Sequence, residues 1–513
     1  MNKQSTILTS LALVGVSLAN AASKPNIVFI LADDMGYGDV SYYDQDQKIK
    51  TPYLDQMCKE GVVFRDAHTS SSVSTPSRYS IITGRYNWRS SLKKHVLDGY
   101  GGALITPERE TMASMLKKSG YSTAFIGKWH MGWDWGLKDG ATGPAQYLTE
   151  QGTDNIDYTK RVTNGPADLG FDYSYGIIAS LDFPPYVYVE NGYPTSTNPT
   201  MPPKGKKRGR LGATAPDMKD RSQTLGHITD KACAYIKEQA QTKDPFFLYF
   251  PLTAPHTPIV PTAEFVDKSG LNAYGDFVLM VDVMIGQVMQ AIKDAGIDGE
   301  TLVVFTTDNG CSPAAKIPVL NAKGHFPNSI YRGTKADLFD GGHRVPCIVR
   351  YPDGFKHHEV NQTICMTDFY ATFAKMAGYK LTDQEAEDSY DILTTMTSKK
   401  EVKPIREATV HHSIDGEFAI RQGDWKLLMS ASSGGWSAPK SSNKAAWANL
   451  PPVQLYNMKT DPSEKTNLQD KYPEKVEELK ALLTKYIKEG RSTPGKAQKN
   501  DGPELWEQLH WIS

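Results

Sequence analysis

The sequence predicts an α/β protein with a large, mainly parallel, doubly wound sheet flanked by helices. A smaller C-terminal α+β domain with a short antiparallel sheet is expected to follow it. Two observations support this fold class. Short continuous apolar runs, typical of strands buried on both faces, alternate with helical segments along most of the chain. From about Ile405 this alternation is replaced by a hairpin, one further strand and a closing amphipathic helix.

The length of 513 residues is too great for one simple core, so we expect a larger domain over residues 22–404 and a smaller one over residues 405–513. The net charge of −1 does not indicate a nucleic-acid partner, and none is expected. The cysteines have neither metal-site nor disulfide-framework spacing, so we interpret them as mostly buried small hydrophobic residues: Cys58, Cys233, Cys311, Cys347 and Cys365.

Residues 1–21 have the pattern of a signal peptide. Lys3 supplies a positive start, residues 7–18 are apolar, and residues 19–21 (Ala-Asn-Ala) match a cleavage site. The apolar run is too short to span a membrane, and no cysteine lies at the cleavage point to carry a lipid. A buried first helix is the weaker interpretation, because a strand-like run follows at once. We therefore expect an exported protein, periplasmic or secreted, without a membrane anchor.

Polar side chains follow four predicted strands at the point where each strand ends. Parallel strands of an open α/β sheet bind ligands at their carboxyl ends, and adjacent buried carboxylates need a positive partner. One such terminus could be a solvated turn, but four together indicate a site. The strands and the polar residues that follow them are 26–32 with Asp33 and Asp34, 122–126 with Lys128 and His130, 245–250 with His256, and 301–306 with Asp308 and Asn309.

Residues 74–84 predict a helix that could bind an anion. Pro76 suits the first turn of a helix, and Gly84 suits its end. Ser74 would lie just before the helix, where free amides and the helix dipole favour negative charge, and Arg78 would add a forked cation. Taken alone, such a segment is more typical of a helix cap followed by surface arginines, so its role depends on the rest of the chain.

The C-terminal part and one internal loop complete the prediction. The sequence 204–210 (K-G-K-K-R-G-R) is a basic loop that we interpret as a solvated insertion, the alternative being a guide for anionic polysaccharide. The elements expected in the C-terminal part are a hairpin of residues 418–421 and 425–428, a strand over 454–457, and a helix whose apolar face is Val476, Leu479, Leu483 and Ile487.

The chain resembles the type I sulfatases of the alkaline phosphatase superfamily. Residues 74–78 (S-T-P-S-R), continued by residues 83–85 (T-G-R), are similar to the family signature Cys/Ser-x-Pro-Ser-Arg-x4-Thr-Gly-Arg, and the serine resembles the bacterial serine-type branch. The resemblance extends over nearly the whole mature chain. Its other segments are the Asp-Asp pair 33–34, G-K-W-H-x-G at 127–132, A-P-H at 254–256, D-N-G at 308–310, Lys335, and residues 340–346, where Asp340 replaces the commoner Glu.

This resemblance implies a mechanism. In the family the first signature residue is oxidised to formylglycine, whose hydrated aldehyde attacks sulfur and then releases sulfate. It implies that Ser74 is converted by a serine-type maturase, a transient partner. It also implies one Ca²⁺, and a set of oxygen ligands does suit a hard cation rather than zinc. The implied metal ligands are Asp33, Asp34, Ser74, Asp308 and Asn309. The implied catalytic residues are Arg78 and Lys128 at the formylglycine, His130 for the second step, and His256, as general acid, with Lys335 at the sulfate and leaving oxygen.

The substrate is expected to be a sulfated saccharide, with 6-O-sulfated galactose or N-acetylgalactosamine favoured. Asp182, Trp133 and His325 lie in loops that could hold the sugar. One alternative is a phosphate mono- or diesterase of the same superfamily that uses unmodified Ser74 and two zinc ions. Asn309 argues against it, because the two-zinc relatives carry Asp-His at that turn. The other alternative is a non-catalytic protein that binds sulfated glycans and in which Ser74 is never oxidised.

Overall fold

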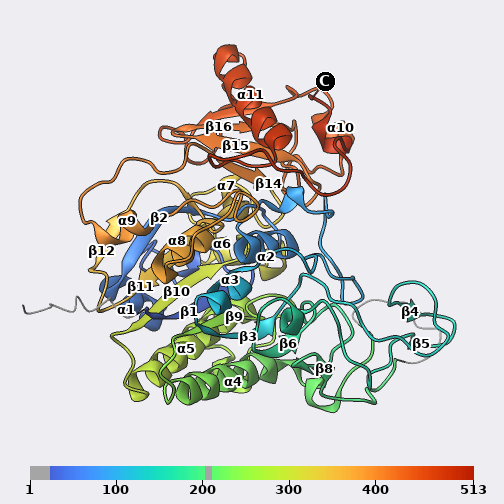
Figure 1. Cartoon of the computed structure of the whole chain (residues 1–513). Coiled ribbons are helices and arrows are strands. Elements are labelled where there is room, and N and C mark those ends of the chain that lie inside the picture. Colours follow the sequence, from blue (N-terminus) through green and yellow to red (C-terminus); the bar gives the residue numbers. More distant parts are fainter. Residues whose placement is uncertain (1–23, 203–210, 513) are drawn as a thin grey trace, which may run out of the picture.

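The structure is a computed structural model that describes residues 24–202 and 211–512. The predicted signal peptide and the basic loop 204–210 lie outside the described residues. The predicted fold class is confirmed: within the described part, one large mixed sheet lies between helices, and a smaller antiparallel sheet from the end of the chain lies beside it (Figure 1). The five cysteines, all within the described ranges, are unpaired, and all but Cys233 are buried.

The large sheet has a parallel centre and antiparallel neighbours. Its order is β12-β2-β11-β10-β1-β9-β3-β6-β7-β8, with β13 beside β2, and β10, β1, β9, β3 and β6 are mutually parallel. The four predicted strands are therefore adjacent, and their ends differ from the prediction by at most two residues. The bounds are β1 Asn26–Ala32, β2 Val62–His68, β3 Ser122–Lys128, β6 Tyr173–Ile177, β7 Val189–Glu190, β8 Tyr193–Pro194, β9 Phe246–Pro251, β10 Thr301–Thr307, β11 Arg344–Arg350, β12 His358–Val360 and β13 Ile364–Cys365. A separate ribbon pairs β4 Tyr147–Leu148 with β5 Thr153–Asp154.

Helices cover both faces of this sheet (Figure 1). One layer contains α1 Pro52–Glu60, α4 Thr224–Gln239 and α5 Ala273–Asp294, and the other contains α2 Ser74–Thr83, α3 Met112–Lys118 and α8 Asp368–Ala377. Helix α5 is long and apolar enough to cross a membrane, but 72% of its apolar window is buried inside the protein, as expected for a core helix. The shorter helices are α6 Ile317–Ala322, α7 Asp340–His343 and α9 Leu393–Thr397.

The C-terminal sheet has the order β14-β15-β16-β17 and is antiparallel throughout. The predicted hairpin, strand and helix are all present, and the four expected apolar residues of the helix are buried. The prediction missed the first strand, whose four residues are partly polar. The bounds are β14 Thr409–His412, β15 Phe418–Gln422, β16 Trp425–Leu428, β17 Gln454–Asn457, α10 Lys444–Trp447 and α11 Pro473–Glu489.

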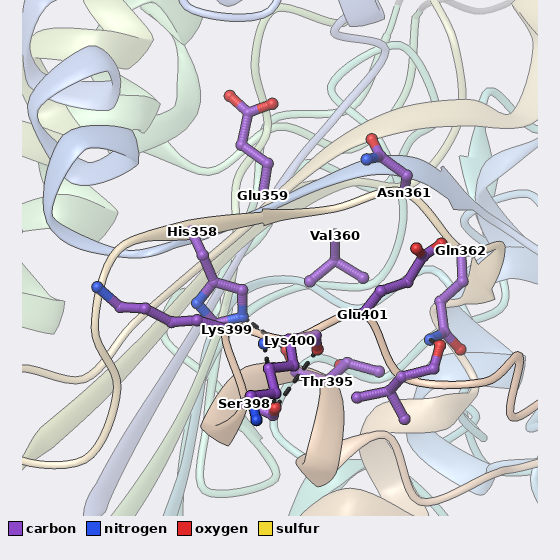
Figure 2. Close-up of a pocket in the computed structure, with 11 residues that line it drawn as sticks. His358, Glu359, Val360, Asn361, Gln362, Thr395, Ser398, Lys399, Lys400 and Glu401 are labelled. Atoms are coloured by element: carbon purple, nitrogen blue, oxygen red, sulfur yellow. Dashed lines mark hydrogen bonds between the residues drawn. The ribbon is translucent and has the colours of Figure 1, made fainter.

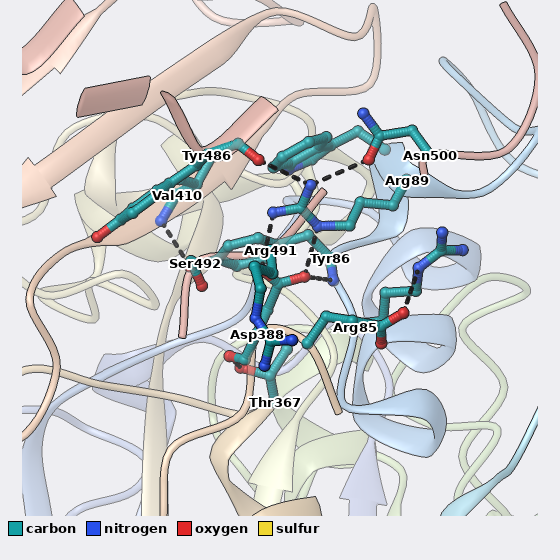
Figure 3. A network of polar contacts seen from close by, with 12 residues as sticks. Arg85, Tyr86, Arg89, Thr367, Asp388, Val410, Tyr486, Arg491, Ser492 and Asn500 are labelled. Carbon is teal, nitrogen blue, oxygen red and sulfur yellow. Dashed lines mark hydrogen bonds and ion pairs between the residues drawn. The ribbon is translucent and has the colours of Figure 1, made fainter. Parts of the chain in front are cut away.

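Buried charges join the C-terminal part to the main sheet layer. Figure 3 shows Arg89, just beyond α2, donating to both oxygens of Asp388 at 2.7 and 2.9 Å, and to the backbone oxygen of Tyr486 at 2.9 Å. Arg85 donates to Asp501, near the end of the chain, at 2.8 Å. The hydrogen bond to Tyr486 and the ion pair with the half-exposed Asp501 join the C-terminal segment to the residues at the end of α2.

Candidate active site

Ser74 lies at the start of α2, a helix whose residues are all buried. Pro76 occupies the first turn, where its missing amide costs no hydrogen bond. Gly84 ends the helix with a φ of 64°, in the left-handed region that favours glycine. The predicted helix is confirmed with one difference: Ser74 is its first residue, and extended Val73 precedes it. Ser74 is 1% exposed, so its hydroxyl lies inside the protein at the positive end of the helix dipole.

The predicted carboxylates converge because β1 and β10 are parallel neighbours that stay in register to their last residues. Asp33 and Asp34 follow β1, and Asp308 and Asn309 follow β10. The backbone amide of Asp34 donates to Oδ1 of Asp308 at 3.2 Å, and Nδ2 of Asn309 donates to Oδ1 of Asp34 at 2.8 Å. Asp34 has a φ of 67°, which is uncommon outside glycine and typical of strain kept at functional sites.

Lys128, at the end of β3, joins Ser74 to the first carboxylate. Its Nζ lies 2.7 Å from Oδ2 of Asp33 and 3.4 Å from Oγ of Ser74, and the Ser74 hydroxyl donates to Oδ1 of Asp33 at 3.3 Å. Burial raises the pKa of Asp33, but the positive charges around it, led by Lys128, outweigh burial and hold that pKa well below its usual value. Asp33 is therefore ionised at neutral pH. Burial lowers the pKa of Lys128.

Two more cations pair with the other carboxylates. Arg78 donates from Nε and Nη2 to Oδ2 of Asp308 at 3.1 and 2.8 Å. Nζ of Lys335 lies 2.7 Å from Oδ1 of Asp34, although 301 residues separate the two along the chain. Together with Lys128 and Asp33 these pairs give a buried group of three cations and three carboxylates whose formal charges cancel.

His130 is held as a neutral imidazole beside this group. Its Nε2–H donates to the backbone oxygen of Leu97 at 2.9 Å, while its buried Nδ1 has no partner among the described residues. Burial, reinforced by the charges of Lys128 and Arg78, lowers the pKa of His130 well below its usual value. One ring nitrogen is therefore available inside the site as a hydrogen-bond acceptor.

His256 faces Asp34 from the loop after β9. Its Nδ1–H donates to the backbone oxygen of Thr257 at 2.7 Å, which leaves Nε2 pointing inward, 3.7 Å from Oδ2 of Asp34. Asp182 lies on the other side, 3.9 Å from Nδ1, and accepts hydrogen bonds from the hydroxyls of Ser180 and Thr257. Burial alone would raise the pKa of Asp182. The electrostatic interaction with His256 and the two hydroxyl hydrogen bonds outweigh burial, so the pKa of Asp182 lies below its usual value.

The donor set at the centre fits a hard divalent cation. Oδ1 of Asn309 is buried and has no hydrogen-bond partner among the described residues, although its amide nitrogen is bonded. A buried carbonyl oxygen without a donor is costly, and a cation would satisfy it. Ligand atoms of Asp33, Asp34 and His256 lie within 4.8 Å of one another. The carboxylates and the amide supply the oxygen ligands that Ca²⁺ prefers.

Two of the three predicted sugar contacts are corrected by the structure. Trp133 is 1% exposed and packs edge-to-face against Trp135, so its indole belongs to the core. His325 is fully buried, and its Nε2 lies 2.7 Å from Oδ1 of Asp39. Neither side chain is placed to contact a substrate. Asp182 remains a predicted sugar contact, because it lies beside His256 and 17% of its side chain is exposed.

Sequence reasoning missed the contribution of β14 to the site. The backbone amide of Ser72, two residues before Ser74, donates to the backbone oxygen of His412 at 3.0 Å, and Ser71 pairs with His412 in a parallel bridge. On the other side, the amide of Ala336 donates to the backbone oxygen of Ser72 at 2.8 Å. The segment that carries Ser74 is thus held between the C-terminal sheet and the loop of Lys335. These are backbone contacts, for which the sequence contains no local pattern.

A second cluster of buried histidines lies next to β14 and has a structural character. The rings of His343 and His411 stack in parallel with centroids 3.7 Å apart. The Nδ1 atom of His68 lies 2.9 Å from the Nδ1 atom of His343. One ligand atom from each of the three rings lies within 4.8 Å of the others, but the Nδ1 atoms of His68 and His343 face each other at hydrogen-bond distance. Nε2 of His68 bonds Asp66, and the ammonium of Lys426 lies 3.2 Å from Nε2 of His343. A metal ion is disfavoured there.

A surface pocket lies far from these groups. Figure 2 shows it between the edge strand β12 and the segment after α9, where Nε2 of His358 donates to the backbone oxygen of Thr395 at 2.7 Å. Four strand spacings separate β12 from β1, or about 19 Å. The pocket therefore belongs to a different part of the molecule from the charged group around Ser74.

Comparison with known proteins agrees with this arrangement. Residues 25–379 match the sulfatase family model. The chain is 32% identical to an N-acetylgalactosamine-6-O-sulfatase of Bacteroides thetaiotaomicron, over 90% of this chain and 93% of that protein. It is 28% identical to human arylsulfatase A, over 87% and 84% of the two chains. A solved structure described with the metabolism of multiple glycosaminoglycans by Bacteroides thetaiotaomicron superposes with a TM-score of 0.77 at 31% identity, covering 90% of this chain and 99% of that one.

The match covers well over half of the chain and includes every residue of the charged group described above. The sequence signature at Ser74, the convergence of the strand ends and the similarity to named sulfatases are therefore consistent with one another. The chain belongs to the sulfatase family and is a sulfuric ester hydrolase.

Proposed function

We propose that this protein hydrolyses a carbohydrate sulfate ester, a 6-O-sulfated N-acetylgalactosamine or galactose unit, through a formylglycine made from Ser74. The observation that carries the proposal is the position of the Ser74 hydroxyl, which is buried at a helix N-terminus within reach of both Lys128 and Asp33. The substrate is supported by the names of relatives from Bacteroides thetaiotaomicron, rat and mouse, which are N-acetylgalactosamine-6-sulfatases.

Two groups would supply chemistry that the side chains lack. Ca²⁺, held by Asp33, Asp34, Asp308, Asn309 and the group at position 74, would add two positive charges to a site whose own charges cancel, which suits an anionic sulfate. Formylglycine would supply a second hydroxyl, and with it a way to release sulfate that a plain serine does not have.

The chain's own residues then have distinct tasks. Lys128 and Arg78 place positive charge beside position 74, where it favours an ionised hydroxyl. His130 is neutral, and its unpartnered Nδ1 can accept a hydrogen bond inside the site. Lys335 lies next to Asp34 with its ammonium available to a sulfate oxygen. His256 presents Nε2 to the same side, where a proton can pass to the departing sugar oxygen as the sulfur–oxygen bond breaks.

We further propose that residues 1–21 direct export, to the periplasm or the medium, and that residues 22–404 form the sulfatase domain with residues 405–513 as its C-terminal α+β domain. A serine-type maturase is the proposed transient partner. The match of residues 25–379 to the sulfatase family model supports the proposed sulfatase domain.

The His256→Ala variant is expected to lose activity in a way that depends on the leaving group. A general acid matters most when the departing alkoxide is basic, as it is for a sugar hydroxyl. Turnover of a sugar sulfate should fall by about 10²–10⁴-fold, and turnover of an activated aryl sulfate by less than about tenfold. The measurement is kcat/KM for both substrates with wild-type and variant protein of equal formylglycine content.

His256→Gln is the matched variant, since it keeps a polar side chain of similar size but cannot donate a proton as an imidazolium does. It should show the same split between the two substrates. Equal losses on the sugar sulfate and the aryl sulfate would show that His256 only binds sulfate.

The proposed function itself is tested with matured protein and a panel of sulfated saccharides. Release of sulfate from 6-O-sulfated N-acetylgalactosamine or galactose, with slower release from 2-O-, 3-O- and 4-O-sulfated sugars, is the expected result. Preferred cleavage of a phosphate ester, or binding of sulfated sugars without sulfate release by fully converted protein, would contradict it.

A further inference from the structure

The connection between β16 and β17 presents a tryptophan to solvent beside the site. Trp436 is 41% exposed. Its backbone is nevertheless rigidly held, because the amides of Trp436 and Ser437 donate to Oδ1 of Asp337 at 2.7 and 3.0 Å. Asp337 is fully buried and also accepts a hydrogen bond from the amide of Thr334 at 2.8 Å. An exposed aromatic ring on a backbone fixed in this way has the character of a binding group, because rigid loops commonly carry such groups.

This loop is in direct contact with the loop of Lys335. Asp337 is two residues beyond Lys335, a span of at most about 7 Å. A Cβ atom on Gly435 would lie 2.3 Å from the backbone oxygen of Ala336, so the two loops approach too closely for any residue but glycine. The backbone at Trp436 therefore lies against the loop that carries Lys335, the lysine whose ammonium contacts Asp34.

Two polar side chains, those of Asp415 and His95, lie near this loop. The hydroxyl of Ser441 donates to a carboxylate oxygen of Asp415, and its oxygen lies 3.0 Å from the backbone oxygen of Gly435. Asp415 therefore lies close to the loop that carries Trp436. Nδ1 of His95 lies 3.9 Å from Oδ1 of Asp415, and the side chains of His95 and Asp415 are 57% and 36% exposed. A carboxylate and an imidazole are thus open to solvent near the loop that carries Trp436.

The segment that carries His95 is tied to the nucleophile. His95 is two residues from Leu97, whose amide donates to the hydroxyl of Thr75 at 3.2 Å and whose oxygen accepts from His130. The amide of His95 donates to the backbone oxygen of Ile414 at 2.6 Å. The rim formed by Trp436, Asp415 and His95 therefore extends from the loop of Lys335 to the loop that contacts Thr75.

We infer that Trp436, Asp415 and His95 form a subsite for the pyranose unit next to the sulfated one; this inference rests on the proposed function. A pyranose has a face of C–H groups that packs on an indole, and hydroxyls that bond a carboxylate and an imidazole. Sites for such ligands combine an aromatic surface with a few placed polar groups. The sulfated unit occupies the centre, and its neighbour in the saccharide chain lies on the rim.

The test compares a sulfated monosaccharide with a sulfated tri- or tetrasaccharide that carries the same terminal unit. Trp436→Ala should raise KM for the oligosaccharide by about three- to tenfold, as expected for the loss of one aromatic contact, and change KM for the monosaccharide by less than about twofold. Trp436→Phe retains a ring and should restore most of the affinity. Leu450→Ala is the matched control, because Leu450 is 46% exposed on the same connection but is not part of the rim.

A second measurement needs no turnover. Calorimetric binding of the oligosaccharide to Ser74→Ala protein should weaken by the same factor when Trp436→Ala is added, and should not change with Leu450→Ala. Equal effects on the monosaccharide and the oligosaccharide, or no effect on either, would overturn the subsite. If converted wild-type protein releases no sulfate from any saccharide, the proposed function fails, and the calorimetric comparison still decides the subsite.

Discussion

Protein that carries only unmodified Ser74 is expected to fold, to bind Ca²⁺ and to bind substrate, but to release at most one equivalent of desulfated sugar per chain and no free sulfate. A serine hydroxyl can at best become sulfated once, because it lacks the second hydroxyl that would expel sulfate. Relative to converted protein, kcat should be lower by a factor on the order of 10⁴–10⁶, comparable to the loss of the nucleophile in other covalent hydrolases. Co-expression of a serine-type maturase should restore activity in proportion to the converted fraction.

The converted fraction is measured by peptide mass and by carbonyl-reactive probes, and activity is plotted against it. Ser74→Cys should transfer the dependence to a cysteine-type maturase, since Thr75 to Arg78 already match the rest of the signature. Ser80→Ala is the control on the same helix: it removes a buried hydroxyl that bonds Ser70, 2.6 Å away, and should leave the activity of converted protein in place. Full turnover by protein shown to carry only serine would contradict the mechanism and favour the phosphatase alternative.

Asp308→Ala is expected to abolish activity through two losses at once. It removes a charged oxygen ligand for Ca²⁺, and it leaves the buried guanidinium of Arg78 without the oxygen that accepts its Nε and Nη2 hydrogen bonds. Removal of one partner from a buried ion pair costs about 3–5 kcal/mol. The variant should therefore melt at a lower temperature as well as lose calcium and turnover.

Asp308→Asn separates the two effects, because it keeps a carbonyl oxygen and the side-chain shape but not the charge. Calcium content per chain and the melting temperature with and without chelator are the measurements. Chelation should destabilise wild-type protein, since an ion that binds only the folded state stabilises it by mass action, and should have little effect on either variant. Asp282→Asn, a buried aspartate that caps α1 away from the site, should retain calcium. Normal calcium content and turnover in Asp308→Ala would remove Asp308 from the metal shell.

The sequence was informative about the centre of the sheet because the signals there are local. A strand buried on both faces needs a continuous apolar run, and a parallel neighbour places the following residues at the same edge. Asp33, Lys128, His256 and Asp308 could therefore be assigned to one rim from their positions alone. The same reasoning failed for Trp133 and His325, because a loop residue becomes buried only through the segments that pack on it. Asp39, which bonds His325, lies 286 residues earlier in the chain.

By itself, the sequence determined which chemical groups are available and which strands carry them, because strand propensity and helix capping depend on neighbours along the chain. Only the tertiary structure decided which charge pairs with which, that Lys335 contacts Asp34, and that β14 holds the backbone before Ser74. It also decided that Trp436 lies beside the site. These contacts join loops far apart in the sequence, whose approach depends on the packing of both sheets as a whole and leaves no pattern in any one segment.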